Sequence, residues 1–351
     1  MSPVSMYQSG NAWQNNRYAF MSEFNKRKGI KSFGISKKSG NHYFHLITEK
    51  DRLHNFLNEP EILLEVERRF SDHKAGDKNR VFSNTVASQP CCFNLFAPLQ
   101  KNLSLSSSLF SGLLGKPAIV NEIVIEFTPQ TNGIYGDESI GDQSANGGTD
   151  ADVAIFYTAG ATKGVILIEF KYIESEFSVC GSFRDDAKAK KLRHRCLNGG
   201  FYEDLISPNL SENKGRFECG YLKYKNWQLT RDSQVFDINA IAGSAGCPFR
   251  FSGQQLWRNL LLAEQVAKQR NLDEFSFWVL APAENTFLWN EKSSNVESEI
   301  RKVLTPEGNS VFKSLQLNKD FFQVLKPLAN DEWTKNWLQK FEEKYLTDTA
   351  I

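Results

Sequence analysis

The side chains of two acidic residues and one lysine are expected to meet in the folded chain. Asp152 opens the segment DVAIFY, and Glu169 and Lys171 close the segment GVILIEFK. Carboxylate oxygens are ligands that Mg²⁺ or Mn²⁺ prefers. A bound divalent cation lowers the pKa of water and stabilises charge that develops on a scissile phosphate. These residue types therefore suit the hydrolysis of a phosphodiester by a metal-activated water.

The segments that carry these residues have the composition of buried strands. Both are short, nearly all apolar and rich in β-branched residues. Because alternate residues of a strand share a face, Glu169 and Lys171 point the same way and Phe170 points into the opposite layer. If residues 159–163 form a hairpin turn, Asp152 lies opposite Glu169. Such charges are costly to bury unless they are paired or bound to a metal.

The rest of the chain supplies the elements that position this site. The first third is predicted to be mainly helical, with helices over 11–28, 51–73 and 80–113. A strand is expected over 121–127, a helix over 252–270, a fourth strand over 274–282, and C-terminal helices over 293–304 and 330–346. The order helix, three strands, helix, strand predicts an α/β (mixed α+β) fold whose mixed sheet has one parallel pair. We expect three parts: 1–120, a core at 121–282 with an insertion at 172–250, and an extension at 283–351.

These residues carry a resemblance to a known superfamily. Asp152, followed 17 positions later by Glu169-Phe170-Lys171 on the next strand, resembles the pattern of the PD-(D/E)xK nucleases, which include restriction endonucleases. Roughly residues 60–280 resemble more closely a little-characterised bacterial family of restriction-endonuclease-like nucleases. The matching segments are SQPCCFNLFAPL, EIVIEFTP, YGDESIGDQSANGGTDADVAIFY, ILIEFKY and QQLWRNLLLA. One departure is Ala151, where the superfamily commonly has proline.

The resemblance implies roles for individual residues. Asp152 and Glu169 would ligate Mg²⁺, with Mn²⁺ as a substitute, and the backbone carbonyl of Phe170 would be a third ligand. Lys171 would orient the attacking water or help to deprotonate it. The superfamily often has a further acidic ligand upstream.

For two of the expected metal ligands, a second acidic residue nearby is an alternative candidate. Glu122 and Glu126 lie four residues apart on one face of the first strand, and we favour Glu122 as the additional ligand. Asp150 is the rival of Asp152, which we prefer because the apolar strand begins directly after it. Both upstream glutamates would otherwise be solvated carboxylates at a strand end.

Basic residues in the insertion indicate a polyanionic partner. DNA is the expected partner, with RNA and a homodimer left open; a solvated helix face is the alternative interpretation of the basic run. Gln255 and Arg258 begin the helix after the insertion and could meet a phosphate, because helix N-termini favour anions. The basic run consists of Lys188, Lys190, Lys191, Arg193, His194 and Arg195.

The net charge of the 351-residue chain, +1, conceals an uneven distribution. Residues 121–171 hold 2 basic and 8 acidic positions, whereas residues 1–120 hold 16 and 9. An acidic strand unit suited to a cation is thus preceded by a part of the chain whose excess of positive charge suits a polyanion. The chain starts without a secretory signal and contains no long apolar run, so we expect a cytoplasmic protein without a membrane span.

Several alternatives remain open at this point. The six cysteines form no CxxC pair, and a zinc site built from His194, Cys196, Cys219 and Cys247 is a weaker hypothesis. A nuclease fold that binds nucleic acid or a partner without cutting, or a carboxylate-based hydrolase of a small substrate, would also use such a sheet. A second Glu-x-Lys, Glu342-Glu343-Lys344, is interpreted as a solvated helix face.

Overall fold

The computed structural model describes residues 4–72, 78–127, 150–180, 226–250, 252–291 and 294–347, together with residue 197. Its N-terminal part contains α1 (Ala12–Arg27), β1 (Phe33–Ile35), β2 (His42–Ile47), η1 (Glu49–Asn55), α2 (Pro60–Asp72), α3 (Lys78–Ser83), α4 (Ser88–Lys101) and α5 (Leu103–Leu114). The core continues with β3 (Ile119–Phe127), β4 (Ala151–Ala159), β5 (Thr162–Phe170), α9 (Asn226–Arg231), α10 (Ile238–Ala242), α11 (Gly253–Gln269) and β6 (Glu274–Ala281).

The C-terminal part is made of short elements that end in one long helix. It comprises η3 (Thr286–Trp289), β7 (Asn290–Glu291), β8 (Ser294–Asn295), α12 (Val296–Arg301), α13 (Pro306–Val311), β9 (Phe312–Gln316), η4 (Leu317–Phe321), α14 (Phe322–Leu325), η5 (Lys326–Leu328) and α15 (Glu332–Tyr345). The side chain of Asp331 caps α15 by accepting from the backbone N–H of Thr334.

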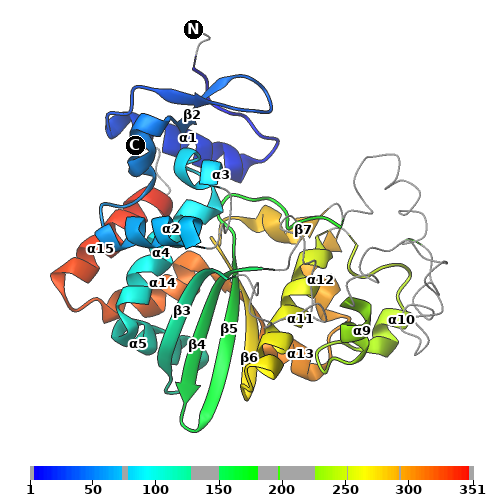
Figure 1. Cartoon of the computed structure of the whole chain (residues 1–351). Helices are drawn as coiled ribbons and strands as arrows, with labels where there is room; N and C mark the ends of the chain where they lie inside the picture. Colours follow the sequence, from blue (N-terminus) through cyan, green and yellow to red (C-terminus); the bar gives the residue numbers. More distant parts are fainter. Residues whose placement is uncertain are drawn as a thin grey trace.

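A five-stranded mixed sheet with the order β3-β4-β5-β6-β9 forms the centre (Figure 1). β3, β4 and β5 pair antiparallel, and β5, β6 and β9 pair parallel. The β4–β5 turn is Gly160-Ala161, where Gly160 has the left-handed φ of 63° that tight hairpins require. This turn is shorter than we expected, but Val153 pairs with Ile168, so the predicted register with Asp152 opposite Glu169 holds.

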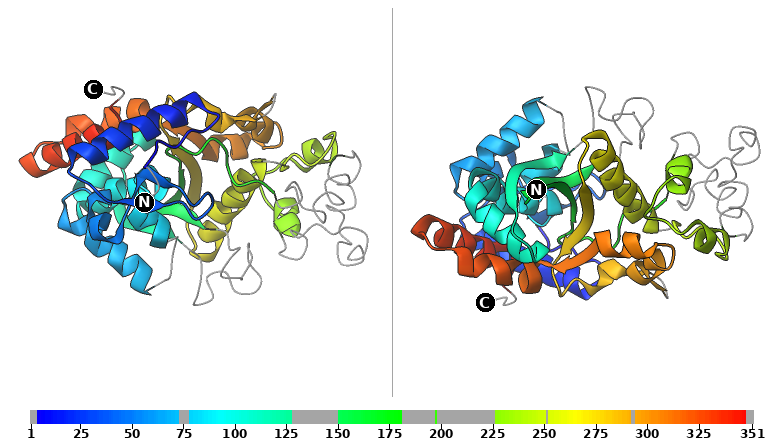
Figure 2. Two further views of the ribbon diagram at one scale, coloured as in Figure 1. Left: turned by 90° about the horizontal axis from the view of Figure 1, so that it is seen from above. Right: turned by 90° about the horizontal axis from the view of Figure 1, so that it is seen from below.

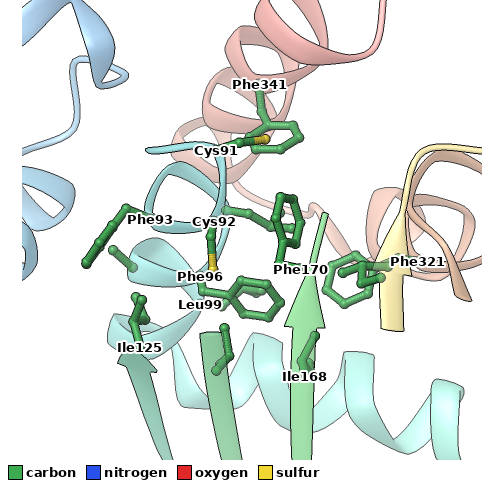
Figure 3. Close-up of a cluster of buried hydrophobic side chains, with 14 of the residues drawn as sticks. Cys91, Cys92, Phe93, Phe96, Leu99, Ile125, Ile168, Phe170, Phe321 and Phe341 are labelled. Carbon is green, nitrogen blue, oxygen red and sulfur yellow. The ribbon is translucent and has the colours of Figure 1, made fainter. Parts of the chain in front are cut away.

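Each face of the sheet packs against helices. Ile125, Ile168 and Phe170 pack with α4 on one face, where Phe96 meets the Phe170 ring edge-on (Figure 3). On the other face, Leu167 packs against residues of α11 such as Leu260. The views in Figure 2 likewise place α11 on the side of the sheet opposite α4 and α5. Phe170 therefore points away from the face toward which α11 lies, as the strand alternation predicts.

The predicted α/β class and mixed sheet are confirmed, whereas several elements were not anticipated. The parallel β5–β6 pair and the helix between these strands are as expected. The first third is less helical than predicted, because it contains the β1–β2 hairpin, and the helix predicted over 51–73 is interrupted between η1 and α2. β9 was missed, although it lies in the extension that we expected to be helical. Its five residues are too few for a clear alternating pattern.

The prediction that Lys344 lies on a solvated helix face is wrong. Its residue is 1% exposed, and its Nζ donates to the backbone carbonyls of His54 (3.1 Å) and Asn55 (2.6 Å). Both carbonyls lie at the end of η1, where helix-type hydrogen bonds run out. Burial lowers the pKa of Lys344 to about 7. The lysine of this second Glu-x-Lys thus joins α15 to η1.

Two further features bear on the expectations from sequence. In the described part of the chain, no helix has both the length and the apolar character that crossing a membrane demands. Cys91, Cys92, Cys180 and Cys247 are free thiols. The other members of the hypothetical zinc site, His194, Cys196 and Cys219, lie outside the described residues, so that hypothesis stays untested.

Candidate active site

Three carboxylates line up across neighbouring strands at one edge of the sheet. Val153 of β4 pairs with Ile168 of β5 and with Ile125 of β3. One step further along the same registers, Asp152 lies between Glu169 and Glu126. The expected pairing of Asp152 with Glu169 therefore follows from the observed hairpin register, and β3 adds a third acid to the row.

Asp152 is held in the row by a backbone hydrogen bond. The backbone N–H of Phe170 donates to Asp152 Oδ2 at 2.6 Å. Burial, followed by the charges of Glu169 and Glu126, raises the pKa of Asp152 well above its ordinary value. The mutual repulsion of these carboxylates is an electrostatic cost that a bound cation would relieve.

Lys171 lies within the same group of charges. Its Nζ is 2.8 Å from Glu169 Oε1, and its side chain is 11% exposed. Burial by itself would lower the pKa of Lys171, but the carboxylates of Glu169 and Asp152 outweigh burial and raise it above its ordinary value. Lys171 is therefore a charged donor at neutral pH.

Helix α11 fixes the orientation of the Glu169 carboxylate. Gln255 Nε2 donates to Glu169 Oε1 at 2.7 Å, and Asn259 Nδ2 donates to Glu169 Oε2 at 2.8 Å. Gln255 Oε1 also accepts from the backbone N–H of Ser178 at 2.8 Å. Gln255, which could have met a phosphate, thus binds the Glu169 carboxylate, and Asn259 is a residue of the candidate site that was not predicted from sequence. Its four-residue spacing from Gln255 on one helix was the available signal.

The structure brings Glu126 to the acidic row and leaves Glu122 away from it. Glu122 pairs with Phe156, four positions before Glu126, and is thus roughly 13 Å along the strand. Its carboxylate is 58% exposed and lies 3.9 Å from Arg270. Glu126 is 8% exposed, and burial, with the charge of Asp150 next, raises its pKa to about 7. Alternation put both residues on one face but did not reveal which one reaches the edge.

Glu126 also has an unusual backbone. Its φ is 53°, in the left-handed region that residues other than glycine seldom adopt. The guanidinium of Arg69 donates to the Glu126 carbonyl, and the Gln89 side chain hydrogen-bonds its carboxylate. A conformation of this kind costs on the order of 1–3 kcal/mol and persists where surrounding contacts enforce it, often at functional sites.

The first turn of α4 contacts the site on both sides. While Gln89 holds Glu126, Ser88 Oγ donates to Glu174 Oε1 at 2.8 Å. Arg80 donates to the same oxygen at 2.6 Å. Burial would raise the pKa of Glu174, but the cations of Lys171 and Arg80 lower it instead. These contacts give Ser88 and Gln89 a place in the site that their sequence alone did not suggest.

The remaining predicted residues have mixed outcomes. Asp150 lies just before β4, and the residue as a whole is exposed. Desolvation of its carboxyl group and the charge of Glu169 raise its pKa to about 6, and the charge of Arg258 opposes this rise. Arg258 thus lies near the acids, whereas the ligand role of the Phe170 carbonyl stays a prediction. The basic run, Lys188, Lys190, Lys191, Arg193, His194 and Arg195, lies outside the described residues.

The chemistry of the row fits a hard divalent cation. Among the described residues, no three His, Cys, Asp or Glu side chains are arranged as a ready-made metal site. The carboxylates are instead bound by protein donors: Phe170 N–H at Asp152, and Lys171, Gln255 and Asn259 at Glu169. All the acidic donors are oxygen atoms, which suits Mg²⁺ or Mn²⁺ better than zinc or copper. The chemistry of the donor set fits such an ion, and its binding would have to replace the present protein partners of these carboxylates.

Comparison with known proteins places this chain in a family. A family model described as "Restriction Endonuclease associating with ARP" matches residues 17–346. The chain belongs to this family. No curated protein and no solved structure matches the chain. The family match extends beyond the segments that first suggested a nuclease, and it includes most of α1 and all of α15. The five-stranded mixed sheet at the centre of the matched region is consistent with a restriction-endonuclease-like α/β core.

Asn259 offers a prediction about positioning. Asn259→Leu should lower the rate of any metal-dependent cleavage by roughly 10- to 100-fold, because Glu169 Oε2 loses a fixed donor and rotates more freely. It should also raise the metal concentration needed for half-maximal rate, which a general loss of stability would not do. Rates measured across a Mn²⁺ titration test this. Asn336→Leu, on the exposed face of α15, is the control, and equal metal dependence in both variants would contradict the role.

Proposed function

We propose that this chain is a metal-dependent nuclease that hydrolyses phosphodiester bonds of DNA. The observation that carries the proposal is the convergence of Glu126, Asp152 and Glu169 at one sheet edge with a charged lysine beside them. Membership of a restriction-endonuclease family supports a nucleic-acid substrate.

The chain's own residues divide the work. Asp152 and Glu169 would hold Mg²⁺ or Mn²⁺, with Glu126 in the upstream position that we had expected for Glu122. The ion, when bound, supplies an acidified water and stabilises charge on the phosphate. Gln255 and Asn259 hold Glu169 in place. Lys171, freed from Glu169 when a cation takes that carboxylate, would donate to the attacking water or to a phosphate oxygen.

The position of one pocket bears on the competing hypothesis of a small-substrate hydrolase. A pocket of about 500 Å³ lies between the η1–α2 region and α15, lined by residues such as Phe24, Leu57 and Lys340 and by none of the site residues. It therefore gives no support to a small-substrate hydrolase working at Glu169. The alternative of a nuclease fold that binds without cutting keeps every contact of the site and differs only in activity.

A plasmid assay tests the proposal. We expect the purified full chain to nick supercoiled plasmid with Mg²⁺ or Mn²⁺ and to leave it intact in EDTA. Asp152→Ala, purified in the same way, should show no cleavage. Cleavage that persists in Asp152→Ala would overturn the site, and gel retardation of DNA without cleavage under any divalent metal would favour the binding-only alternative. A parallel assay with single-stranded RNA distinguishes the two nucleic acids.

A further inference from the structure

A short N-terminal stretch holds almost all the positive charge excess of the first 120 residues. Residues 24–48, which we call the basic segment, contain six basic residues and no acidic one. The other 95 residues of this part carry 10 basic and 9 acidic positions. The six are Lys26, Arg27, Lys28, Lys31, Lys37 and Lys38, and all are exposed.

Half of these charges have no evident structural use. Lys26 and Arg27 lie in the last turn of α1, where cations complement the helix dipole, and Lys26 also pairs with Glu23 at 2.7 Å. Lys31, Lys37 and Lys38 lie beyond the helix, and within the described residues they take part in no ion pair. Three exposed like charges in a short segment repel one another, so a polyanion is their natural partner.

The β1–β2 hairpin presents two of these lysines on an ordered turn. The N–H of Ser36 donates to the carbonyl of Asn41 at 2.9 Å, and the N–H of Gly40 donates to the carbonyl of Ser36 at 2.8 Å. Gly40 adopts the left-handed φ of 71° that this turn needs. Lys37 and Lys38 follow Ser36 directly. Because the backbone beneath them is already fixed, binding would order little beyond the side chains.

The basic segment is joined to the candidate active site through β2. The carbonyl of His45 accepts from both the N–H (3.0 Å) and the Oγ1 (2.9 Å) of Thr85. Three residues later, Ser88 donates to Glu174, whose carboxylate faces Lys171. The segment from Thr85 to Ser88 thus contacts the hairpin at one end and, at the other, the carboxylate of Glu174 that interacts electrostatically with Lys171.

Helix α1 makes a second connection to the same region. Gln14 Nε2 donates to the carbonyl of Ile173 at 2.8 Å, and Trp13 Nε1 donates to that of Tyr172 at 3.4 Å. These two acceptors directly follow Lys171 in sequence. In Figures 1 and 2, α1 and β2 lie over the edge of the sheet at which β5 ends. Helix α1, whose C-terminal end begins the basic segment, and strand β2, which ends it, therefore both lie over the strand ends that carry the acidic row.

We infer that the basic segment binds the phosphate backbone of the nucleic acid beside the bond that the site cleaves. This inference rests on the proposed nuclease function and adds to it the surface that holds the substrate. Lys31, Lys37 and Lys38 each contact a phosphate and release its condensed counterions. These contacts are to the backbone, so they position the strand without reading its sequence.

The test compares two triple variants of the full chain. Lys31/Lys37/Lys38→Ala removes the contacts, and Lys302/Lys319/Lys335→Ala removes the same number of exposed lysines from the C-terminal part. Binding of a fluorescent DNA duplex is measured by anisotropy in EDTA over a range of KCl concentrations. The first variant should lower the slope of log K against log [KCl] by about 2–3 and weaken binding at least about tenfold at low salt, whereas the control should match wild type.

Each other result has a defined meaning. A basic-segment variant that binds DNA like the control overturns the inference, even if wild type cleaves DNA and the proposed function stands. Loss of salt-sensitive binding in that variant supports the inference even if wild type cuts nothing, in which case only the proposed function fails. Reduced binding to vesicles containing phosphatidylserine, with DNA binding unchanged, would assign the segment to a membrane surface and overturn it. Equal melting temperatures of the two variants show that both are folded.

Discussion

Lys171→Met is expected to reduce DNA cleavage by roughly 10³-fold or more, because the site loses the ammonium group that pairs with Glu169 and faces Asp152. Methionine keeps the length and apolar stem of lysine, so packing of this 11% exposed side chain should survive. Glu169 would still be held by Gln255 and Asn259. The measurement is the single-turnover rate on plasmid or duplex DNA at saturating Mg²⁺.

The matched control for this variant lies on the same strand. Lys163 is an exposed residue at the other end of β5, and Lys163→Met should leave the rate unchanged. Affinity for Mn²⁺ should be kept or increased in Lys171→Met, since the ammonium no longer competes for Glu169. A rate within about threefold of wild type would remove Lys171 from the mechanism, given that a positioned acid, base or donor typically contributes 10²–10⁴-fold.

The second large effect should distinguish Glu126 from Glu122, which strand alternation places on the same face of β3. Glu126→Gln is expected to weaken Mn²⁺ binding and to lower cleavage by roughly 100-fold or more, because the acidic row loses one of its three charges. Glu122→Gln, on the same strand but exposed and paired only loosely with Arg270, should behave like wild type. Calorimetric titration of Mn²⁺ and cleavage rates measure both. Comparable losses in the two variants would contradict the placement of Glu126.

The raised pKa of Glu126 gives this variant a distinctive pH dependence. With a folded-state pKa of about 7, a proton must leave Glu126 before a cation binds below that pH. Wild-type affinity for Mn²⁺ should therefore fall by up to about tenfold per unit as the pH drops from 7 to 5, a component that Glu126→Gln lacks.

Without metal, the stability of the fold should fall as the pH rises, whereas the affinity for Mn²⁺ should increase. A carboxyl whose pKa is higher in the folded state stabilises the fold fully below the unfolded value of 4.5, and that contribution is lost as the pH rises through about 7. At pH 8 in EDTA, Glu126→Gln should therefore be more stable than wild type by about 3–4 kcal/mol, because the pKa rises from 4.5 to about 7 and each unit corresponds to about 1.4 kcal/mol. Urea unfolding curves measure the difference, and a less stable variant would contradict burial of a charged Glu126.

The N-terminal elements changed in meaning between sequence and structure. From sequence, residues 1–120 were a mainly helical part with an excess of basic residues. In the fold, α1 donates hydrogen bonds to the residues after Lys171, and the first turn of α4 holds both Glu126 and Glu174. Contacts of this kind join residues 37 to 159 positions apart and leave no local periodic signal.

What the sequence determined by itself was the local geometry of the strands that carry the candidate site. Alternation with period two and a short hairpin are set by neighbouring residues, so they placed Asp152 opposite Glu169, with Lys171 on the same face and Phe170 on the other. Only the tertiary structure decided between Glu122 and Glu126. The left-handed backbone at Glu126 is contacted by Arg69 and Gln89 from two other helices, and β3 also shifts its register near Val120. Side chains from α11 were likewise beyond prediction, because which helix residue meets a given strand end is fixed by packing rather than by local propensity.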